Sequence, residues 1–236
     1  MKFLFEGRFL IVLFLLVCTV LLIVYSATTL TPPATQSSAT SCIQSFGSGY
    51  TGALWTKDGE TAGRICLLES NRMRVDHHVR KLPDGSTIND WLWIDYGDRV
   101  NVLVRETSGK FLVLEQTKYA LEVASLAVVG GFIDKNEAPA VAAAREVKEE
   151  LGVTCDTITA LGKYRTDVNR GLGWVYGFIA QKCSAVNSNE LEVEVEDADK
   201  KQEVQELRRL SVTEIEDAVM SGRFVEVQWR FESVNV

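Results

Sequence analysis

The chain has 236 residues, a length that allows one domain of ordinary size together with a smaller appendage. Hydrophobic residues make up 46% of the sequence, which is enough to build a buried core. The formal net charge of −7, with no basic cluster anywhere in the sequence, argues against a nucleic-acid-binding protein. A polyanionic substrate would therefore need a metal ion to neutralise its charge.

The first predicted element is an apolar segment from Phe9 to Tyr25, which two basic residues precede. Its length lies within the roughly 17–25 residues that cross a bilayer of about 30 Å. This favours a cytosolic N-terminus at 1–8 and a transmembrane signal anchor at 9–26, with all later residues on the luminal or extracellular side. The alternative is a cleaved signal peptide and a soluble protein in the secretory pathway.

Residues 27–60 are rich in Ser, Thr, Pro and Gly, a composition that predicts a flexible stalk. No CxxC motif or His/Cys spacing indicates a zinc site. If the later residues are luminal, the cysteines offer two candidate disulfides, Cys42–Cys66 and Cys155–Cys183. Buried free thiols are the alternative.

Short apolar-rich runs separated by turn residues then predict strands. The runs are 64–70, 73–82, 86–96, 99–106, 110–116, 155–167 and 173–183. The first three form a predicted N-terminal β extension over 61–96, with a hairpin turn at Pro83-Asp84-Gly85. The remainder, 97–236, is the predicted main domain. An acidic run at 187–203 predicts a loop, and a capping box of Ser211 and Glu214 predicts a C-terminal helix that ends near Gly222.

One further helix is predicted between the fifth and sixth of these strands, within 131–153. Pro139 suits its first turn, Asn136 is the expected N-cap and Gly152 the expected stop. An apolar stripe is expected along it, made of Ala140, Ala144, Val147 and Leu151. Strands, this helix, more strands and a terminal helix together predict an α/β sandwich.

The same helix carries three carboxylates in one arc, Glu146, Glu149 and Glu150, with Arg145 placed to pair with Glu149. Three neighbouring carboxylates repel one another unless a cation lies among them. Oxygen ligands at this density suit Mg²⁺, or Mn²⁺, and these ions commonly serve phosphate chemistry. An ordinary solvated Glu/Lys helix face is the alternative for the REVKEEL run taken by itself.

The longer segment resembles the Nudix box at every specified position, and the chain is identified on this ground as a member of the Nudix hydrolase family. The matching residues are Gly131, Glu137, Arg145, Glu146, Val147, Glu149, Glu150, Gly152 and Val153. The resemblance implies the Nudix fold, a mixed β-sheet between helices, and hydrolysis of a pyrophosphate bond by water. It also implies that Glu146, Glu149, Glu150 and the carbonyl of Gly130 bind the metal, and that Arg145 holds Glu149 rather than touching substrate.

Outside the box, residues 73–222 are similar to the ADP-ribose pyrophosphatase branch, in RKLPDGSTINDW, VNVLV and FLVLEQTKY. That branch has an N-terminal β-hairpin ahead of the catalytic domain, often swapped in a homodimer. It acts on small nucleotides, nucleoside diphosphates linked to a sugar. The resemblance therefore implies a homodimer and a substrate of the ADP-ribose or nucleotide-sugar type.

By the same resemblance, a catalytic base is expected in a loop beyond the last core strand. The best match is Glu203, with Glu196 and Glu206 behind it. Chemistry alone would also allow Glu149 or Glu150 to act as the base.

Residues that could contact the substrate are predicted on both sides of the box. Trp91 and Trp93 lie two apart on one face of a strand, where an aromatic ring could stack on the base. One of them is expected in the core or at a dimer interface instead. Lys118, Arg165 and Arg170 are candidate phosphate contacts.

The chain also departs from the branch pattern. The usual Gln-aromatic-Arg is Gln116-Thr117-Lys118, which replaces a bidentate fork by a point charge. A glutamate expected before the box is Ala127, and a proline expected after it is absent from 168–171. These departures leave three hypotheses open. They are a diphosphatase for nucleotide-sugar type substrates, a Nudix hydrolase for another nucleotide (a triphosphate, dinucleoside polyphosphate or coenzyme), and a non-catalytic binding module.

Overall fold

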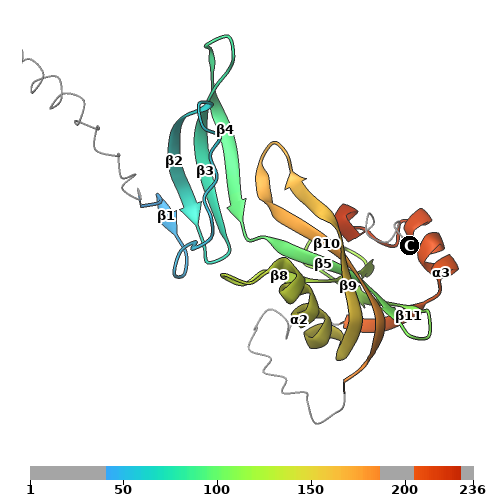
Figure 1. Ribbon diagram of the computed structural model, residues 1–236. Helices are drawn as coiled ribbons and strands as arrows, with labels where there is room; N and C mark the ends of the chain where they lie inside the picture. Colours follow the sequence, from blue (N-terminus) through green and yellow to red (C-terminus); the bar gives the residue numbers. More distant parts are fainter. Residues whose placement is uncertain (1–40, 187–204, 230–236) are drawn as a thin grey trace, which may run out of the picture. The chain divides into compact units, whose positions relative to one another are not determined.

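The computed structural model describes residues 41–186 and 205–229 (Figure 1). The predicted anchor at 9–26 and two of the predicted loop glutamates, Glu196 and Glu203, lie outside these residues. Within the two described ranges, no helix is both long enough and apolar enough to cross a membrane. The chain from Cys42 onward clusters as one compact unit.

Eleven strands of the described part form one sheet, whose neighbours run in the order β1-β2-β3-β4-β10-β5-β6-β11. Off this path, β7 pairs with β6, β8 with β5 and β9 with β10. The strands are β1 (Gln44–Ser45), β2 (Thr61–Glu69), β3 (Met73–Lys81), β4 (Thr87–Tyr96), β5 (Arg99–Glu106), β6 (Phe111–Gln116), β7 (Ser125–Ala127), β8 (Val129–Phe132), β9 (Val153–Asp167), β10 (Gly171–Ala185) and β11 (Gln205–Leu210). Helices α2 (Pro139–Leu151) and α3 (Val212–Met220) lie within the described residues.

Two hydrophobic cores lie on opposite faces of the sheet, because side chains alternate along each strand. On β5, Val100, Val102 and Val104 pack in the core beneath α2, whereas Leu103 packs in the core beneath α3 (Figure 1). β5 pairs parallel with β10 and antiparallel with β6 and β8, so the sheet is mixed. A mixed sheet between helices is the fold that the sequence predicted.

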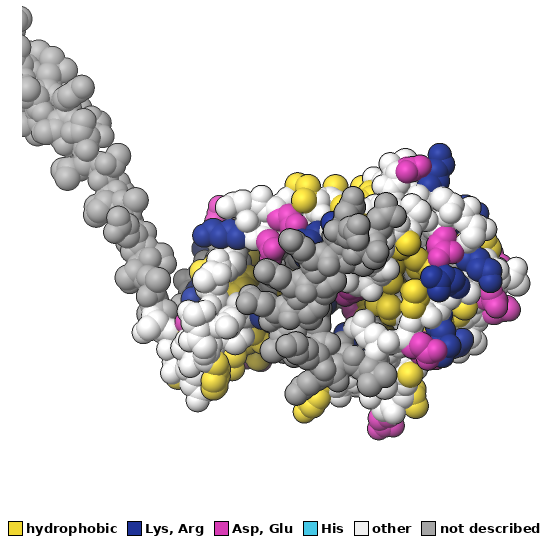
Figure 2. All heavy atoms as spheres, turned by 90° about the horizontal axis from the view of Figure 1, so that it is seen from below, with side chains coloured by type: hydrophobic (Ala, Val, Ile, Leu, Met, Phe, Trp, Pro, Cys, Tyr) yellow, Lys and Arg dark blue, Asp and Glu magenta, His cyan; other side chains and the backbone are white. Residues whose placement is uncertain are grey.

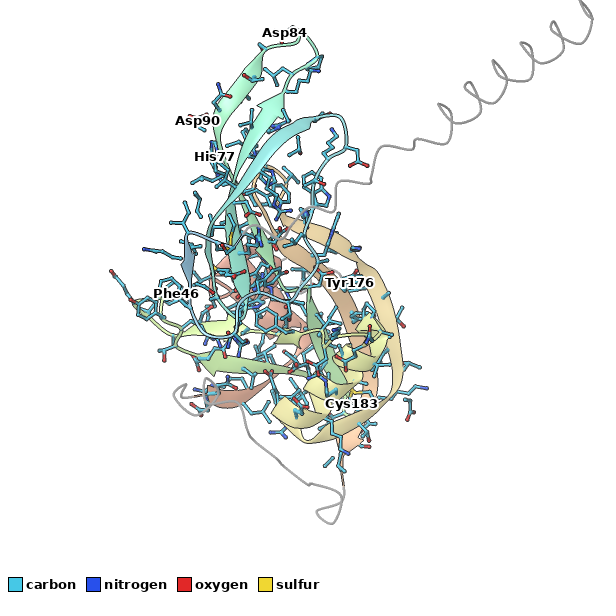
Figure 3. All side chains as sticks on the ribbon, turned by 90° about the vertical axis from the view of Figure 1, so that its left-hand side faces the viewer. Phe46, His77, Asp84, Asp90, Tyr176 and Cys183 are labelled. Carbon is cyan, nitrogen blue, oxygen red and sulfur yellow. A yellow bond between two sulfur atoms is a disulfide. The ribbon has the colours of Figure 1, made fainter. Side chains whose placement is uncertain are left out.

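The N-terminal extension is an antiparallel meander of β2, β3 and β4 that continues into β5. Asp84 lies at the tip of its β3–β4 hairpin, and His77 and Asp90 lie along its strands (Figure 3). At its base, Ile94 of β4 pairs in parallel with Gly171 of β10. The extension therefore shares one sheet with the domain that carries the predicted metal helix.

Four strands were not predicted from the sequence: β1, which lies in the predicted stalk, and β7, β8 and β11. β7 and β8 are short, and the two glycines of β8 reduce its strand propensity. β11 is mostly polar, and pairs along its whole length with β6 as an edge strand of the path. Its backbone pairing, rather than its hydrophobicity, makes it a strand.

The predicted stalk over 27–60 extends too far toward the C-terminus. Residues from Cys42 belong to the compact unit, where β1 pairs with β2. Trp55 stacks on Trp93, with ring centroids 4.3 Å apart, and its backbone N–H donates to Asp95. Composition alone did not reveal these contacts, because they depend on single residues within a Ser/Gly-rich segment.

Both candidate disulfides are present in the described unit. Cys42 and Cys66 have Cα atoms 4.6 Å apart and join the N-terminal segment to β2. Cys155 and Cys183 face each other across β9 and β10, with Cα atoms 4.0 Å apart. The alternative of free buried thiols is therefore wrong for these four residues. Each cross-link closes a loop long enough to stabilise a fold by about 3 kcal/mol.

Candidate active site

The two ends of helix α2 agree only in part with those predicted from the sequence. Its N-cap is Ala138, which makes no side-chain capping bond, so the prediction of Asn136 is wrong; Asn136 has φ of 69° and lies before the cap. The helix ends at Gly152, whose N–H donates to the carbonyl of Lys148 at 2.9 Å. Pro139 occupies the first turn, as predicted.

The buried face of α2 also differs from the predicted stripe. The buried residues are Ala142, Ala143, Glu146 and Val147, whereas the predicted Ala140 and Ala144 are exposed. The helix is rotated about its axis so that the row containing Glu146 faces the sheet. One of the three predicted ligands is therefore a core-facing residue.

The carboxylate of Glu146 lies against β8 and is only 3% exposed. A Cβ atom added at Gly131 would collide with that carboxylate, so a larger residue at this position would displace the side chain of Glu146. Gly131 is paired with Val100 of β5 in the middle of the sheet. The strand and the helix are thus in direct contact at the glutamate, which fixes the position of its carboxylate.

Arg145 joins the helix to the loop that precedes it. Its guanidinium donates two hydrogen bonds to Glu137, both 2.9 Å long, and a third of 2.9 Å to the carbonyl of Phe132. It also contacts Glu146 at 2.7 Å and Glu149 at 3.4 Å. The predicted pairing with Glu149 is confirmed, but it is the longest of these contacts.

The contacts between Arg145 and Glu137 shift the pKa values of the two residues in opposite directions. The hydrogen bonds from Arg145 lower the pKa of Glu137, and those to Glu137 and Glu146 raise the pKa of Arg145. Sequence reasoning assigned no partner role to Glu137, although its fixed place in the box was the available signal.

The donor set on this helix fits a divalent cation. One guanidinium, that of Arg145, contacts the carboxylates of Glu137, Glu146 and Glu149. The side chain of Glu149 is 46% exposed, so it can reach a ligand from solvent. Carboxylates with a nearby backbone carbonyl, such as that of Gly130, are the ligands Mg²⁺ and Mn²⁺ prefer.

Comparison with known families agrees with this geometry. Residues 95–230 match the NUDIX domain, over more than half of the chain. The chain belongs to the Nudix family. Its α2 is accordingly the Nudix helix, and the fold and the family predicted from the sequence are confirmed.

Two Nudix-related similarities give further detail. The chain is 26% identical to the ADP-ribose pyrophosphatase of Bacillus subtilis (strain 168) over 114 residues, which cover 48% of this chain and 61% of that protein. It therefore spans about three fifths of the relative's length. A solved structure described as an ADP compounds hydrolase matches with a TM-score of 0.59 and 15% identity, covering 77% of this chain and 94% of that one. The latter likeness shows the fold alone.

The two predicted tryptophans lie in different surroundings within the extension. Trp93 is 4% exposed, stacks on Trp55 and donates from its indole nitrogen to Asp95 at 2.9 Å. The ring of Trp91 is covered by the guanidinium of Arg80, 4.3 Å from the ring centroid. Trp93 therefore has the core role that was expected of one of the pair.

The structure does not bring the three predicted phosphate contacts together. Arg165 stands over Trp174 and Trp93, at 4.5 and 5.3 Å from the ring centroids, on the far side of β10 and β5 from the box glycines of β8. Arg170 is exposed in the β9–β10 turn. Lys118 lies just beyond β6, where its charge acts on Glu226.

Of the glutamates in the predicted base region, the structure describes Glu206. Glu203 lies outside the described residues. Glu206 is on β11, is 62% exposed and contacts Arg208 at 2.8 Å. On the face drawn in Figure 2, acidic and basic side chains are interspersed.

Sequence reasoning missed a second polar group of residues near the box: Arg99, Asn101 and Glu226. Asn101 lies on β5 directly opposite Gly130 and is only 5% exposed. An asparagine within the otherwise apolar run VNVLV was the signal that could have identified it. Glu226 lies beyond α3, and no local pattern in the sequence associates it with β5.

Proposed function

We propose that this chain is a divalent-metal-dependent hydrolase that cleaves the pyrophosphate bond of nucleoside diphosphate-linked compounds by attack of water. One observation supports this most strongly. The guanidinium of Arg145 gathers the carboxylates of Glu137, Glu146 and Glu149 at the Nudix helix, and Glu146 packs against Gly131. A protein with no cation to bind gains nothing from this repulsion.

The chain's own residues have separate tasks in this proposal. Glu146, Glu149 and Glu150 hold Mg²⁺, or Mn²⁺, together with the carbonyl of Gly130. The bound ion would neutralise the non-bridging oxygens of the pyrophosphate. Arg145 orients Glu146 and Glu149 without touching substrate.

Glu203 is proposed as the base that takes a proton from the attacking water. The support for this assignment is its match to the base region of the ADP-ribose pyrophosphatase branch. A general base contributes about 10²–10⁴-fold in rate. A Glu203→Gln variant should therefore lose this factor in kcat at unchanged metal affinity, whereas an unchanged kcat would return the role to Glu149 or Glu150.

The proposed substrate class is ADP-ribose and related nucleotide sugars. The name of the Bacillus subtilis relative supports it. The replacement of the branch arginine by Lys118 favours a test of other nucleotides as well. The purified full-length chain with Mg²⁺ would be screened against ADP-ribose, UDP-sugars, dinucleoside polyphosphates, coenzymes and nucleoside triphosphates, with release of AMP or phosphate as the measurement.

We further propose that the domain works on the luminal or extracellular side of a membrane, held by the segment at 9–26. The two disulfides support an oxidising compartment. Carbonate extraction of membranes separates the anchored protein from a cleaved, soluble one. The homodimer implied by the resemblance stays a prediction that light scattering can check.

The metal-binding glutamates provide the most direct test of the proposal. Glu149→Gln and Glu150→Gln each remove one charged ligand and should reduce kcat/KM by more than the roughly 10–100-fold typical of residues behind the ligands. Glu216→Gln, the same change at an exposed position of α3, is the matched control and should leave activity unchanged. Full activity in both helix variants would sink the metal-helix assignment.

A further inference from the structure

The polar group of Arg99, Asn101 and Glu226 lies on the face of the sheet opposite the Nudix helix. Arg99 and Asn101 are two residues apart on β5, on the same face as Leu103, which packs beneath α3. The guanidinium of Arg99 stands over the ring of Tyr96, 5.5 Å from its centroid, and donates to the side chain of Gln228 at 3.3 Å. Gln228 belongs to the same C-terminal segment as Glu226.

This group lies beside the backbone of the proposed metal site. Asn101 pairs with Gly130 across β5 and β8. Its Oδ1 would be 2.8 Å from a Cβ atom added at Gly130, so the amide contacts the glycine backbone directly. A ligand held by Asn101 would therefore be next to the strand from which Gly130 presents its carbonyl.

Two donors in this group have no hydrogen-bond partner among the described residues, namely Nδ2 of Asn101 and Nε of Arg99. Buried donors in folded proteins are nearly always paired, and leaving one unpaired costs free energy. A valine at position 101, like its neighbours on β5, would avoid that cost. The unpaired donors point to a ligand with acceptor atoms at this place.

Glu226 adds a carboxyl group, which accepts hydrogen bonds, whereas the unpaired atoms of Asn101 and Arg99 donate them. Burial raises the pKa of its carboxyl above the usual value, while the charges of Arg99 and Lys118 act to lower it. An ionised carboxylate here would repel a phosphate, whereas it would accept a hydrogen bond from a hydroxyl or amine. Amide, guanidinium and carboxyl together match a neutral group that both accepts and donates hydrogen bonds.

We propose that Arg99, Asn101 and Glu226 form the subsite that recognises the uncharged end of the substrate, a nucleobase edge or a ribose diol, beside Gly130. The proposal rests on the proposed hydrolase function and deepens it. It places substrate specificity on β5 and on the segment after α3, rather than on the tryptophans of the extension. Trp93 is already stacked on Trp55, and the Trp91 ring is covered by Arg80.

The test compares Asn101→Val and Glu226→Gln with the unchanged full-length chain. Asn89→Val, at an exposed position of β4, is the control. Binding of AMP, uridine 5′-monophosphate and ribose 5-phosphate is measured by calorimetry with EDTA present, so that metal-dependent turnover does not enter. The unchanged chain should bind at least one of them, and the two subsite variants should bind it about 10–100-fold more weakly.

The pattern across the three probes identifies the group that is read. Preference for AMP over uridine 5′-monophosphate assigns the subsite to the base, and equal binding of all three limits it to the ribose 5-phosphate that they share. The proposal is overturned if the unchanged chain binds none of the three probes. It is also overturned if the variants bind them as tightly as the unchanged chain does.

Thermal unfolding separates recognition from a structural role. Because Asn101→Val removes an unpaired buried donor, its melting temperature without ligand should be no lower than that of the unchanged chain. A lower melting temperature together with unaltered affinity would show that Asn101 serves the fold alone. Hydrolysis of ADP-ribose, measured separately with Mg²⁺, tests the proposed function: its absence would leave the EDTA binding result standing.

Discussion

Two clusters of charged residues in this molecule differ in how arginines and carboxylates are shared. In the Nudix helix, one guanidinium contacts three carboxylates, those of Glu137, Glu146 and Glu149. In the extension, Asp76 is fully buried and is bound by both Arg64 and Arg74, the latter at 3.0 Å. In the first cluster one arginine is shared by three carboxylates, and in the second two arginines hold one buried carboxylate.

The extension cluster is complete without any ligand. Arg64 also contacts Asp95 at 2.8 Å, so two arginines face two aspartates. Asp95 in turn accepts hydrogen bonds from the indole of Trp93 at 2.9 Å and the backbone of Trp55 at 3.1 Å. Each buried charge has a partner of opposite sign, which is the arrangement expected of a structural network. The sharing of one arginine among three carboxylates is therefore a better guide to function than the burial of charge.

Among the tests of this comparison, Asp76→Asn should have the largest effect on the free energy of unfolding. The change keeps the shape of the side chain but leaves two arginines facing one aspartate, and removing one partner of a buried ion pair costs about 3–5 kcal/mol of unfolding free energy. Urea denaturation measures the loss. Asp90→Asn, at an exposed position of the same extension (Figure 3), should stay within about 0.5 kcal/mol.

The kinetic outcome of Asp76→Asn is equally informative. Under conditions where the variant is folded, its kcat with Mg²⁺ should equal that of the unchanged chain, because the cluster serves the fold. A folded variant with reduced kcat would mean that the extension cluster takes part in catalysis and that charge balance does not distinguish the two regions.

A smaller effect should follow from adding Mg²⁺ without substrate. A cation that binds only the folded state stabilises it by about 2.7 kcal/mol at one hundred times its dissociation constant. The melting temperature of the unchanged chain should rise with Mg²⁺ and fall back with EDTA, whereas Glu149→Gln should respond less. Equal shifts in Asp76→Asn and the unchanged chain would place the cation on the Nudix helix. If the melting temperature of Glu149→Gln rises with Mg²⁺ as much as that of the unchanged chain, the cation binds elsewhere.

The two regions also differ in how far the sequence predicts them. The Nudix box is contiguous, so its nine matching positions were enough to identify the helix and the family. The contacts of Arg145 with Glu137 and Phe132 depend on a loop whose path has no helical periodicity. For this reason, the N-cap and the buried face of α2 were predicted wrongly, while the helix that carries Glu146, Glu149 and Glu150 was predicted correctly.

The extension and the polar group on β5 were less predictable for a different reason. Trp55 stacks on Trp93, and Glu226 lies near Arg99, across long stretches of sequence. Such contacts are set by strand order, in particular by the insertion of β10 between β4 and β5. Local patterns predicted seven of the eleven described strands, but they carry no information about which strand lies next to which.

The smallest predicted effect is a pH dependence of stability on the Nudix side of the comparison. The hydrogen bonds from Arg145 depress the pKa of Glu137 in the folded state. Between this lowered pKa and the ordinary value of about 4.3, the unfolded chain binds more protons than the folded one. The stabilisation is therefore present above pH about 4.3 and is lost as the pH falls through the folded-state pKa. Urea midpoints measured from pH 6 down to pH 3 should fall less steeply in Glu137→Gln than in the unchanged chain. If the urea midpoints of the two proteins fall in parallel with pH, the contact between Arg145 and Glu137 does not stabilise the folded state. The role of Arg145 is then confined to orienting the carboxylates of the helix.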